Sequence, residues 1–393
     1  MLRKTVFWIH LACGVAAGLV VLMMSVTGVL LTYQRQILAW VDRAHYAEPA
    51  PGAPRQPLEA LLDAAKLYRP DVAPTTVTVR DDPRAPVTIA AGRSATLHAN
   101  PYTGAIVEQG GEHARAFFEA VTGWHRWFNL SGDDRATARA ITGASNLAFL
   151  FLVLSGIYLW LPRVFKWAAF KTRVLFNARA ESGKARDFNW HHVFGIWSAL
   201  PLAVVVASAV VFSYPWANDL VYRSLGEQPP QRGVRGGPGP GGAGSASSGE
   251  SWGGTASAAT LSYDELFEHA AARAGDWRAL TLTLPGGGAS SVRFGVDQGN
   301  GGQPQLRHNL TLDAATGEVL AWAPFSSQSK GQQARTWIRF LHTGEALGVA
   351  GQTVAGVVSL TSVLMVWTGL ALAFRRLIVP LLPSSRRRRA SAA

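Results

Sequence analysis

Four stretches of the chain are apolar, free of charged residues and too long for buried strands. They are residues 6–33, 141–161, 193–213 and 354–374. A helix needs about 20 apolar residues to cross the hydrocarbon core of a bilayer, and each stretch is long enough. The first also exceeds the apolar core of a secretory signal, which is about 7–15 residues. The pattern predicts four transmembrane helices, the first of which is retained as an anchor.

The two long segments between these runs have the same organisation as each other. Each is interpreted as one helix, two strands and a strand–turn–strand hairpin. The hairpins contain Thr103-Gly104 and Thr316-Gly317, where glycine supplies the positive φ that such a turn requires. The expected helices and strands are 58–68, 75–79 and 87–90 in the first segment and 263–274, 280–284 and 292–296 in the second. Each segment therefore predicts a small α+β domain.

The two halves of the chain match each other at fixed spacings. Gly104 and Gly317 are 213 positions apart, and His10 and His191 are 181 positions apart. The second half is longer because it contains residues 226–257, which are rich in Gly, Pro and Ser and are expected to be a flexible linker. The predicted fold class is a membrane α-helical protein of four transmembrane helices. They form two tandem repeats, each with one α+β domain outside the membrane.

This interpretation divides the chain into nine parts. They are a first transmembrane helix (1–33), a first outer domain (34–112), an outer helix with the second transmembrane helix (113–161), a cytoplasmic loop (162–190), a third transmembrane helix (191–214), the linker (226–257), a second outer domain (258–325), an outer helix with the fourth transmembrane helix (330–376) and a basic cytoplasmic tail (377–393).

The charge distribution gives the orientation. The chain has 37 Lys and Arg against 25 Asp and Glu, a net charge of +12, which alone would suit a nucleic-acid-binding protein. Three short segments (1–5, 162–192 and 375–393) contain 15 basic and two acidic residues, so the excess lies on one side of the membrane. By the positive-inside rule both termini are cytoplasmic and the long segments are outside. The charge therefore indicates topology and excludes nucleic-acid binding.

Four histidines stand at the ends of the apolar runs. His10 and His191 lie at the cytoplasmic ends, and His125 and His342 lie at the outer ends. Neutral imidazole is an axial ligand of haem iron, and helix bundles hold such cofactors between facing helices. Pairing His10 with His191 and His125 with His342 predicts two haems, one near each face. In the repeat alignment His342 matches Asn129, so the outer pair is offset by one helical turn.

Other interpretations of the histidines stay open. A histidine at a membrane interface often serves only as a polar tip at the headgroup level. His192 competes with its neighbour His191, which is preferred because it aligns with His10. His98 and His308 fall on expected strands of the outer domains and are predicted to be solvated.

The chain resembles the PepSY-associated transmembrane proteins of bacterial inner membranes, which include iron-regulated reductases of ferric siderophores. The resemblance depends on His10-x3-Gly14, Thr27-Gly28, Ser155-Gly156, His191-x3-Gly195, Phe340-Leu341-His342-Thr343-Gly344 and Thr368-Gly369. It implies PepSY-like outer domains in the periplasm and a four-helix core in the inner membrane that carries haem b. It also implies electron transfer from a cytoplasmic or quinol donor to a periplasmic acceptor, most simply a ferric siderophore.

Two other functions compete with this haem-dependent reductase. The first is a membrane-anchored protein that uses its PepSY-like domains to bind peptides or proteases without redox activity. The second is a transporter, which is disfavoured because the apolar runs contain no carboxylate. The sequence has no flavin- or nucleotide-binding motif, so the electron donor is expected to be a separate molecule. No catalytic side chain is expected, because the cofactor performs the redox step.

Overall fold

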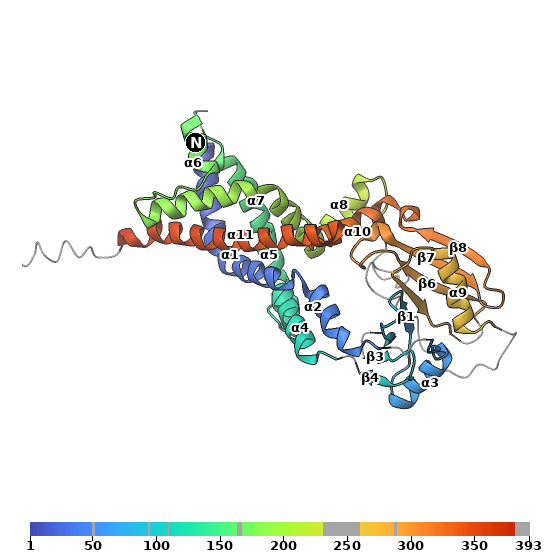
Figure 1. Ribbon diagram of the computed structural model, residues 1–393. Helices are drawn as coiled ribbons and strands as arrows, with labels where there is room; N and C mark the ends of the chain where they lie inside the picture. The colour runs from blue at the N-terminus through green and yellow to red at the C-terminus, as the bar shows by residue number, and fades with distance from the viewer. Residues whose placement is uncertain are drawn as a thin grey trace, which may run out of the picture. The chain divides into compact units, whose positions relative to one another are not determined.

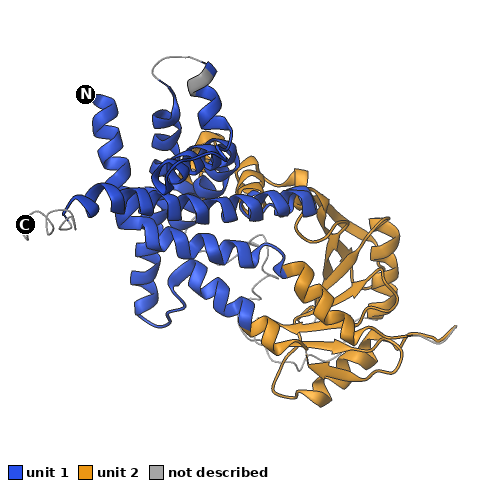
Figure 2. Cartoon of the chain, turned by 60° about the vertical axis from the view of Figure 1, so that its left-hand side comes forward, with its two compact units in different colours: residues 1–34, 117–218, 341–393 blue, residues 35–116, 219–340 orange. Residues whose placement is uncertain are grey.

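The structure is a computed structural model that describes residues 1–48, 52–92, 95–108, 110–162, 167–230, 260–286 and 289–381. The chain forms two compact units, which are coloured separately in Figure 2. The first consists of residues 1–34, 117–218 and 341–393, and the second of residues 35–116 and 219–340. Most of the expected linker (226–257) and of the basic tail (377–393) lies outside the described residues.

The first unit is built on four long helices. They are α1 (Leu2–Leu31), α5 (Asp134–Trp160), α7 (Gly183–Ser213) and α11 (Gly348–Leu377). At 1.5 Å per residue they are about 40–46 Å long, which exceeds the roughly 30 Å of bilayer hydrocarbon. All four are long and apolar enough to cross a membrane. The four predicted transmembrane segments are therefore present as helices.

The four helices pack in a closed ring, whose members can be followed in Figure 1. α1 packs on α5 and α11, and α7 packs on the same two helices. α1 and α7 therefore form one diagonal of the bundle, and α5 and α11 form the other. Polar contacts join neighbours inside the bundle, as where Ser25 Oγ on α1 lies 3.0 Å from Ser362 Oγ on α11.

α7 begins earlier than the apolar pattern indicates. Its first residue is Gly183, whereas the expected third transmembrane helix starts at 191. The reason is a polar first turn, in which the Ser182 hydroxyl accepts a hydrogen bond from Ala185 N at 3.2 Å. The expected loop 162–190 therefore contains the first two turns of this helix.

The shorter elements complete both units. The helices are α2 (Gln34–Asp42), α3 (Leu58–Tyr68), α4 (Glu112–Trp127), α6 (Trp167–Val174), α8 (Pro215–Ser224), α9 (Tyr263–Ala274) and α10 (Lys330–His342). The strands are β1 (Thr76–Arg80), β2 (Val87–Ala91), β3 (Ala95–Ala99), β4 (Ile106–Glu108), β5 (Ala279–Thr283), β6 (Ser291–Asp297), β7 (Arg307–Asp313) and β8 (Val319–Pro324). The described residues also contain five short 3₁₀ turns, among them Arg43–His45 and Glu345–Leu347.

The second unit is one antiparallel sheet of eight strands in the order β4-β3-β2-β1-β5-β6-β7-β8. The two expected outer domains supply four strands each, and they join where β1 pairs with β5. Thr78 lies opposite Thr281 in this pair, with their hydroxyl oxygens 2.9 Å apart. The sequence predicted two separate domains. The structure instead shows a single sheet, because each half leaves its first strand free to pair.

Helices α3 and α9 cover the core face of the sheet, and each helix caps the other. Asp264 Oδ2 on α9 accepts a hydrogen bond from Leu58 N, the first N–H of α3, at 2.9 Å. Glu59 Oε1 on α3 accepts from Tyr263 N, the first N–H of α9, at 2.5 Å. The first N–H groups of a helix have no partner within the helix. This reciprocal exchange satisfies them and fixes the two helices to each other.

The prediction of a solvated His98 was wrong. His98 is only 3% exposed and stacks on His45, with ring centres 5.3 Å apart. Neither of its ring nitrogens has a hydrogen-bond partner in the described part of the chain. Burial lowers the pKa of His98 to about 4. His308 is half-buried, stacks on Trp322 and bonds Gln298 through Nε2.

Candidate functional site

All four candidate histidines lie in the first unit, and they form two pairs by position. His10 on α1 and His191 on α7 come from one diagonal of the bundle, near the N-terminal ends of these helices. His125 is near the end of α4, which leads into α5. His342 is the last residue of α10, which leads into α11. Each expected pair therefore joins helices that belong to opposite corners of the ring.

Two tight reversals of the backbone place His125 and His342. Phe128 and Asn129 adopt positive φ angles of 53° and 54° after α4, and Gly344 adopts 75° after α10. The ring centres of the two histidines are 6.4 Å apart, with an angle of 65° between the ring planes. His125 and His342 are therefore neighbours despite their one-turn offset in the repeat alignment. The turn after α4 and the turn after α10 have different backbone conformations, which compensates for the offset.

The His125 ring is oriented by a hydroxyl group on α1. Its Nδ1 lies 2.9 Å from Thr27 Oγ1. Thr27 Oγ1 also lies 2.7 Å from Met23 O, a carbonyl that only accepts. The single hydroxyl proton is therefore donated to Met23, and the hydroxyl oxygen accepts the hydrogen bond from Nδ1–H of the histidine. In a neutral imidazole this leaves the lone pair on Nε2.

His342 has the same arrangement with residues of α7. Its Nδ1 donates to Val205 O at 2.9 Å and lies 2.9 Å from Ser208 Oγ. Ser208 Oγ in turn donates to Val205 O at 2.6 Å. A backbone carbonyl cannot donate, so Nδ1 of His342 carries the proton. The lone pair is again on Nε2.

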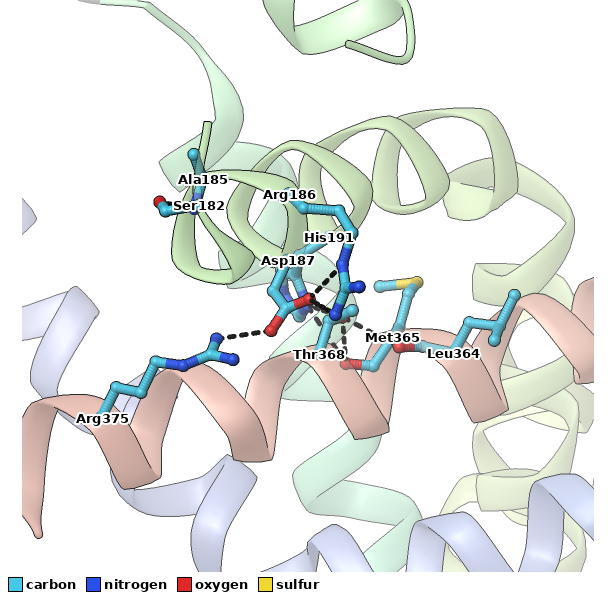
Figure 3. A network of polar contacts seen from close by, with 9 residues as sticks. All are labelled: Ser182, Ala185, Arg186, Asp187, His191, Leu364, Met365, Thr368 and Arg375. Atoms are coloured by element: carbon cyan, nitrogen blue, oxygen red, sulfur yellow. Dashed lines mark hydrogen bonds and ion pairs between the residues drawn. The ribbon is translucent and has the colours of Figure 1, made fainter. Parts of the chain in front are cut away.

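His10 and His191 are held in the same way near the other end of the bundle. His10 Nδ1 lies 2.8 Å from Ser155 Oγ, whose proton is donated to Phe151 O at 2.6 Å. His191 Nδ1 donates to Met365 O at 3.1 Å and lies 3.1 Å from Thr368 Oγ1 (Figure 3). The same tautomer therefore follows for both rings.

The structure also distinguishes His191 from His192. The His191 ring contacts α11, whereas His192 Nδ1 donates to Phe188 O of its own helix at 2.8 Å. The His192 ring packs on exposed Phe188, with ring centres 4.1 Å apart. Only His191 therefore bonds to another helix of the ring.

Glycines make room for three of the rings. A Cβ atom at Gly369 would lie 3.2 Å from Cε1 of His191, and one at Gly156 would lie 3.6 Å from Cε1 of His10. A Cβ atom at Gly28 would lie 3.6 Å from Cε1 of His125. Each of these glycines directly follows a hydroxyl residue that bonds the same ring. The hydroxyl–glycine pairs therefore hold a ring and leave space beside it.

A buried ion network lies one helical turn before His191 (Figure 3). Asp187 is 2% exposed and accepts from Arg186 Nη2 at 2.9 Å and from Nη1 of Arg375 on α11. A buried carboxylate is costly unless it is paired in this way. The network therefore ties α7 to α11 next to the ring of His191.

Burial keeps the His125–His342 pair neutral. Burial, and to a lesser extent the nearby His342, lowers the pKa of His125 to about 4. Burial also lowers the pKa of His342, against the opposing effect of the bond to Val205 O. Both rings are thus uncharged near pH 7, which is the state that binds a metal.

Sequence analysis did not assign a role to the four hydroxyl residues Thr27, Ser155, Ser208 and Thr368. A signal for them was present, because Thr27 and Ser208 are 181 positions apart and Ser155 and Thr368 are 213 apart. These are the spacings of the predicted repeat. Only the contacts show that each hydroxyl bonds a histidine.

A family model described as "PepSY-associated TM region" matches residues 7–376. The chain belongs to the PepSY-associated transmembrane family. The match includes all four long helices, the sheet unit and the four histidines of this family member. No curated protein matches the chain.

Proposed function

We propose that this PepSY-associated protein is a di-haem b oxidoreductase of the bacterial inner membrane. It passes electrons across the membrane to a periplasmic acceptor, which we take to be a ferric siderophore. The four long helices are the membrane-spanning core, and the two halves of the chain are tandem repeats. Haem b binds between His10 and His191 near the cytoplasmic face and between His125 and His342 near the periplasmic face.

One observation carries the proposal. All four histidines are bonded through Nδ1 to a hydroxyl on another helix, and each hydroxyl has already donated its proton to a backbone carbonyl. The Nε2 lone pair of every ring is therefore available. Histidines that bind metals are held in this manner, with the second nitrogen donating to a neighbouring acceptor. Four unrelated polar tips at the headgroup level would have no reason to share one tautomer.

The spacing of the His125–His342 pair fits an iron atom between the two rings. A metal–imidazole bond is about 2 Å long, so two imidazoles on opposite sides of one metal have centres roughly 6 Å apart. The observed distance is 6.4 Å. Within the described ranges no group of three or more His, Cys, Asp or Glu residues could hold a metal ion. Two histidines are enough where a porphyrin supplies the other ligands.

Bound haem iron would supply reversible one-electron transfer. His10, His125, His191 and His342 would hold the iron, while the hydroxyl groups fix the tautomer of the imidazoles and the bundle surrounds them. No side chain needs to transfer a proton. Reduction of a ferric chelate favours release of the metal, because Fe(II) binds hard oxygen ligands more weakly than Fe(III). The electron donor is a cytoplasmic protein or a membrane quinol.

The orientation follows from the charged residues near His10 and His191. Arg3 donates to Leu159 O at 2.5 Å, and Arg186 and Arg375 bind the buried Asp187. Basic residues of this kind mark the cytoplasmic side. The sheet unit is then periplasmic, where it meets the acceptor.

A pyridine-haemochrome assay on purified protein from haem-supplemented cells tests the proposal. We expect two haems per chain in the wild type and the loss of about one in each of His10→Ala, His125→Ala, His191→Ala and His342→Ala. The control is His113→Ala, which changes an exposed histidine on α4. Protein without haem and without sharp reduced α bands would overturn the proposal. That result would favour the alternative, a membrane-anchored PepSY protein that binds peptides or proteases.

A further inference from the structure

An apolar stripe on α2 is exposed; Tyr33 at its start has a hydrogen-bond partner in Thr353 on α11, with the two hydroxyl oxygens 2.7 Å apart. Ile37 and Trp40 are 41% and 68% exposed, and Tyr33 just before the helix is 38% exposed. Ala44, just after α2, is exposed as well. These positions follow the spacing i, i+4, i+7 and i+11, which places them on one side of a continuous helical path. The exposed side chains of Ile37 and Trp40 therefore lie on the same side of α2.

The same feature occurs on α8, the helix that follows α7. Trp216 and Leu220 are spaced i, i+4 and are 55% and 58% exposed. Ala217 and Tyr222 on the same helix are buried. One side of α8 is thus packed in the protein while the adjoining apolar side is free. Two helices in different parts of the chain share this property.

Both helices begin where a long apolar helix ends. α2 starts at Gln34, directly after α1 ends at Leu31, and α8 starts at Pro215, directly after α7 ends at Ser213. α1 is 30 residues long, or about 45 Å, so its C-terminal end reaches beyond the hydrocarbon into the headgroup region. The first turn of each short helix therefore lies in the headgroup region, because it follows the end of a long helix within one or two residues.

The chemistry of the stripes suits the same environment. Tryptophan and tyrosine concentrate at membrane–water interfaces, because their rings are apolar and carry one polar group. Arg43 directly follows α2, and Arg223 lies near the end of α8; both are exposed. Arginine at such positions extends toward lipid phosphates while its stem covers apolar surface.

We propose that α2 and α8 are interfacial helices whose apolar stripes, centred on Trp40 and Trp216, lie in the lipid headgroup region of the leaflet where α1 and α7 end. A lipid surface fits better than a second protein. Each stripe holds only two or three large side chains, well short of the roughly 800 Å² per partner of a stable protein interface. The proposal does not depend on haem binding.

Site-specific fluorescence in nanodiscs tests this inference. The background is full-length Cys13→Ser, which removes the single cysteine. Trp40→Cys and Trp216→Cys are labelled with an environment-sensitive fluorophore and placed in phosphatidylcholine–phosphatidylglycerol nanodiscs. The control is Leu67→Cys on α3, a site that is 84% exposed. Ile37→Cys and Leu220→Cys are second sites on the same stripes and replace any tryptophan variant that fails to fold.

We expect a nitroxide on the lipid headgroup to quench labels at 40 and 216 several-fold more than the label at 67. Iodide in the buffer should show the opposite order. Equal iodide quenching at all three sites would overturn the proposal. Labels shielded from iodide but not quenched by nitroxide lipid would also overturn it, and would indicate a protein partner. Disulfide-linked dimers of Trp40→Cys would then identify that partner as a second copy of the chain.

Discussion

Thr27 Oγ1 accepts a hydrogen bond from His125 Nδ1 at 2.9 Å while donating its own proton to Met23 O at 2.7 Å. The threonine is therefore a relay with a fixed direction. The helix carbonyl orients the hydroxyl, and the hydroxyl orients the ring. Because a hydroxyl has one proton, the ring cannot exchange its tautomer without breaking the bond to Met23. Through this hydroxyl, the backbone of α1 fixes the orientation and the tautomer of the His125 ring.

Thr27→Val removes this relay while keeping the shape of the side chain. The buried Nδ1–H loses its acceptor, which costs about 1–3 kcal/mol. Loss of a residue that orients a metal ligand lowers metal affinity by about 10–100-fold. We therefore expect weaker haem retention at the His125–His342 pair and a shifted reduction potential, measured by haem titration and spectroelectrochemistry.

The matched control for this substitution is Thr361→Val. The hydroxyl of Thr361 also donates to its own helix, at Val357 O, but does not bond a histidine. It should bind haem as the wild type does. Thr27→Ser, which keeps the hydroxyl, should restore haem affinity and potential. A Thr27→Val protein with unchanged affinity and potential would show that the hydroxyl has no positioning role.

His191 and His192 should respond differently to the same substitution. His191 bonds to α11 through Met365 O, whereas His192 bonds only within its own helix, to Phe188 O. We expect His191→Ala to lose about one haem per chain and His192→Ala to lose none, by the pyridine-haemochrome assay. The reverse result would contradict the assignment of the ligand and would favour a ring that rotates toward the bundle when haem binds.

Gly344 is required by the turn that leads from His342 into α11. Its φ is 75°, and a Cβ atom there would collide with the backbone of Gly351. A left-handed conformation costs an L residue about 1–2 kcal/mol, and overpacking adds about 1–3 kcal/mol. We expect Gly344→Ala to lower the thermal unfolding midpoint by several degrees and to reduce haem at the His125–His342 pair.

Gly226→Ala is the control for backbone strain alone. Gly226 has a φ of 77°, but no atom of the described residues lies within 4 Å of the position that a Cβ would occupy. It should lower the unfolding midpoint less than Gly344→Ala and leave the haem content unchanged. Equal effects of the two substitutions would mean that the contact with Gly351 is unimportant.

Hydrophobic pattern alone was enough to predict the four long helices, α3 and α9, but not the short helices α2, α6 and α8. α3 and α9 begin and end at the expected residues, and the predicted transmembrane segments lie within α1, α5, α7 and α11 apart from their terminal residues. These elements are local, since their signal is a run or a period within one segment. The pairing of β1 with β5 was not predicted, because two strands 200 residues apart carry no mutual signal in one sequence. The burial of His98 was missed for the same reason, as His45 covers it from another segment.

The histidines were predicted and their hydroxyl anchors were not, although the repeat spacings gave a signal for these anchors. Position at the end of an apolar run singled out His10, His125, His191 and His342. Serine and threonine are common inside apolar helices, where their hydroxyls bond the preceding turn. Ser208 therefore resembles any other such residue until the fold brings it to 2.9 Å from His342.

Asp264 should make the stability of the sheet unit depend on pH. Burial raises its pKa, while the hydrogen bond from Leu58 N lowers it in part. A raised carboxyl pKa in the folded state means that the contribution to stability is present below the unfolded pKa. It is lost as the pH rises through the folded pKa. Asp264→Asn keeps an acceptor for Leu58 N and removes the charge, so its unfolding midpoint relative to wild type should be higher at pH 7 than at pH 4.

Asp264→Ala separates the cap from the charge. It removes the acceptor for Leu58 N, which costs about 1 kcal/mol for a helix cap, so it should unfold at a lower temperature than Asp264→Asn at pH 7. If the alanine variant were the more stable of the two, the reciprocal exchange between α3 and α9 would not stabilise the fold.

His98 should make the sheet unit sensitive to acid, and His98→Phe should remove that sensitivity. Burial lowers the pKa of His98 to about 4 from 6.5, a shift that nearby His45, Arg115 and Arg80 increase and Asp42 opposes. The unfolded chain therefore binds the proton first, and stability falls as the pH drops from about 6.5 to about 4.

The loss from His98 is up to about 3 kcal/mol, at 1.36 kcal/mol per pKa unit. His98→Phe keeps a ring to stack on His45 and removes two buried nitrogens without partners, so it should also raise stability at pH 7 by about 1–2 kcal/mol. Unfolding midpoints between pH 7.5 and 4.5 test both effects, with exposed His113→Phe as the control. A His98→Phe protein with the same acid sensitivity as the wild type would place that sensitivity in other residues.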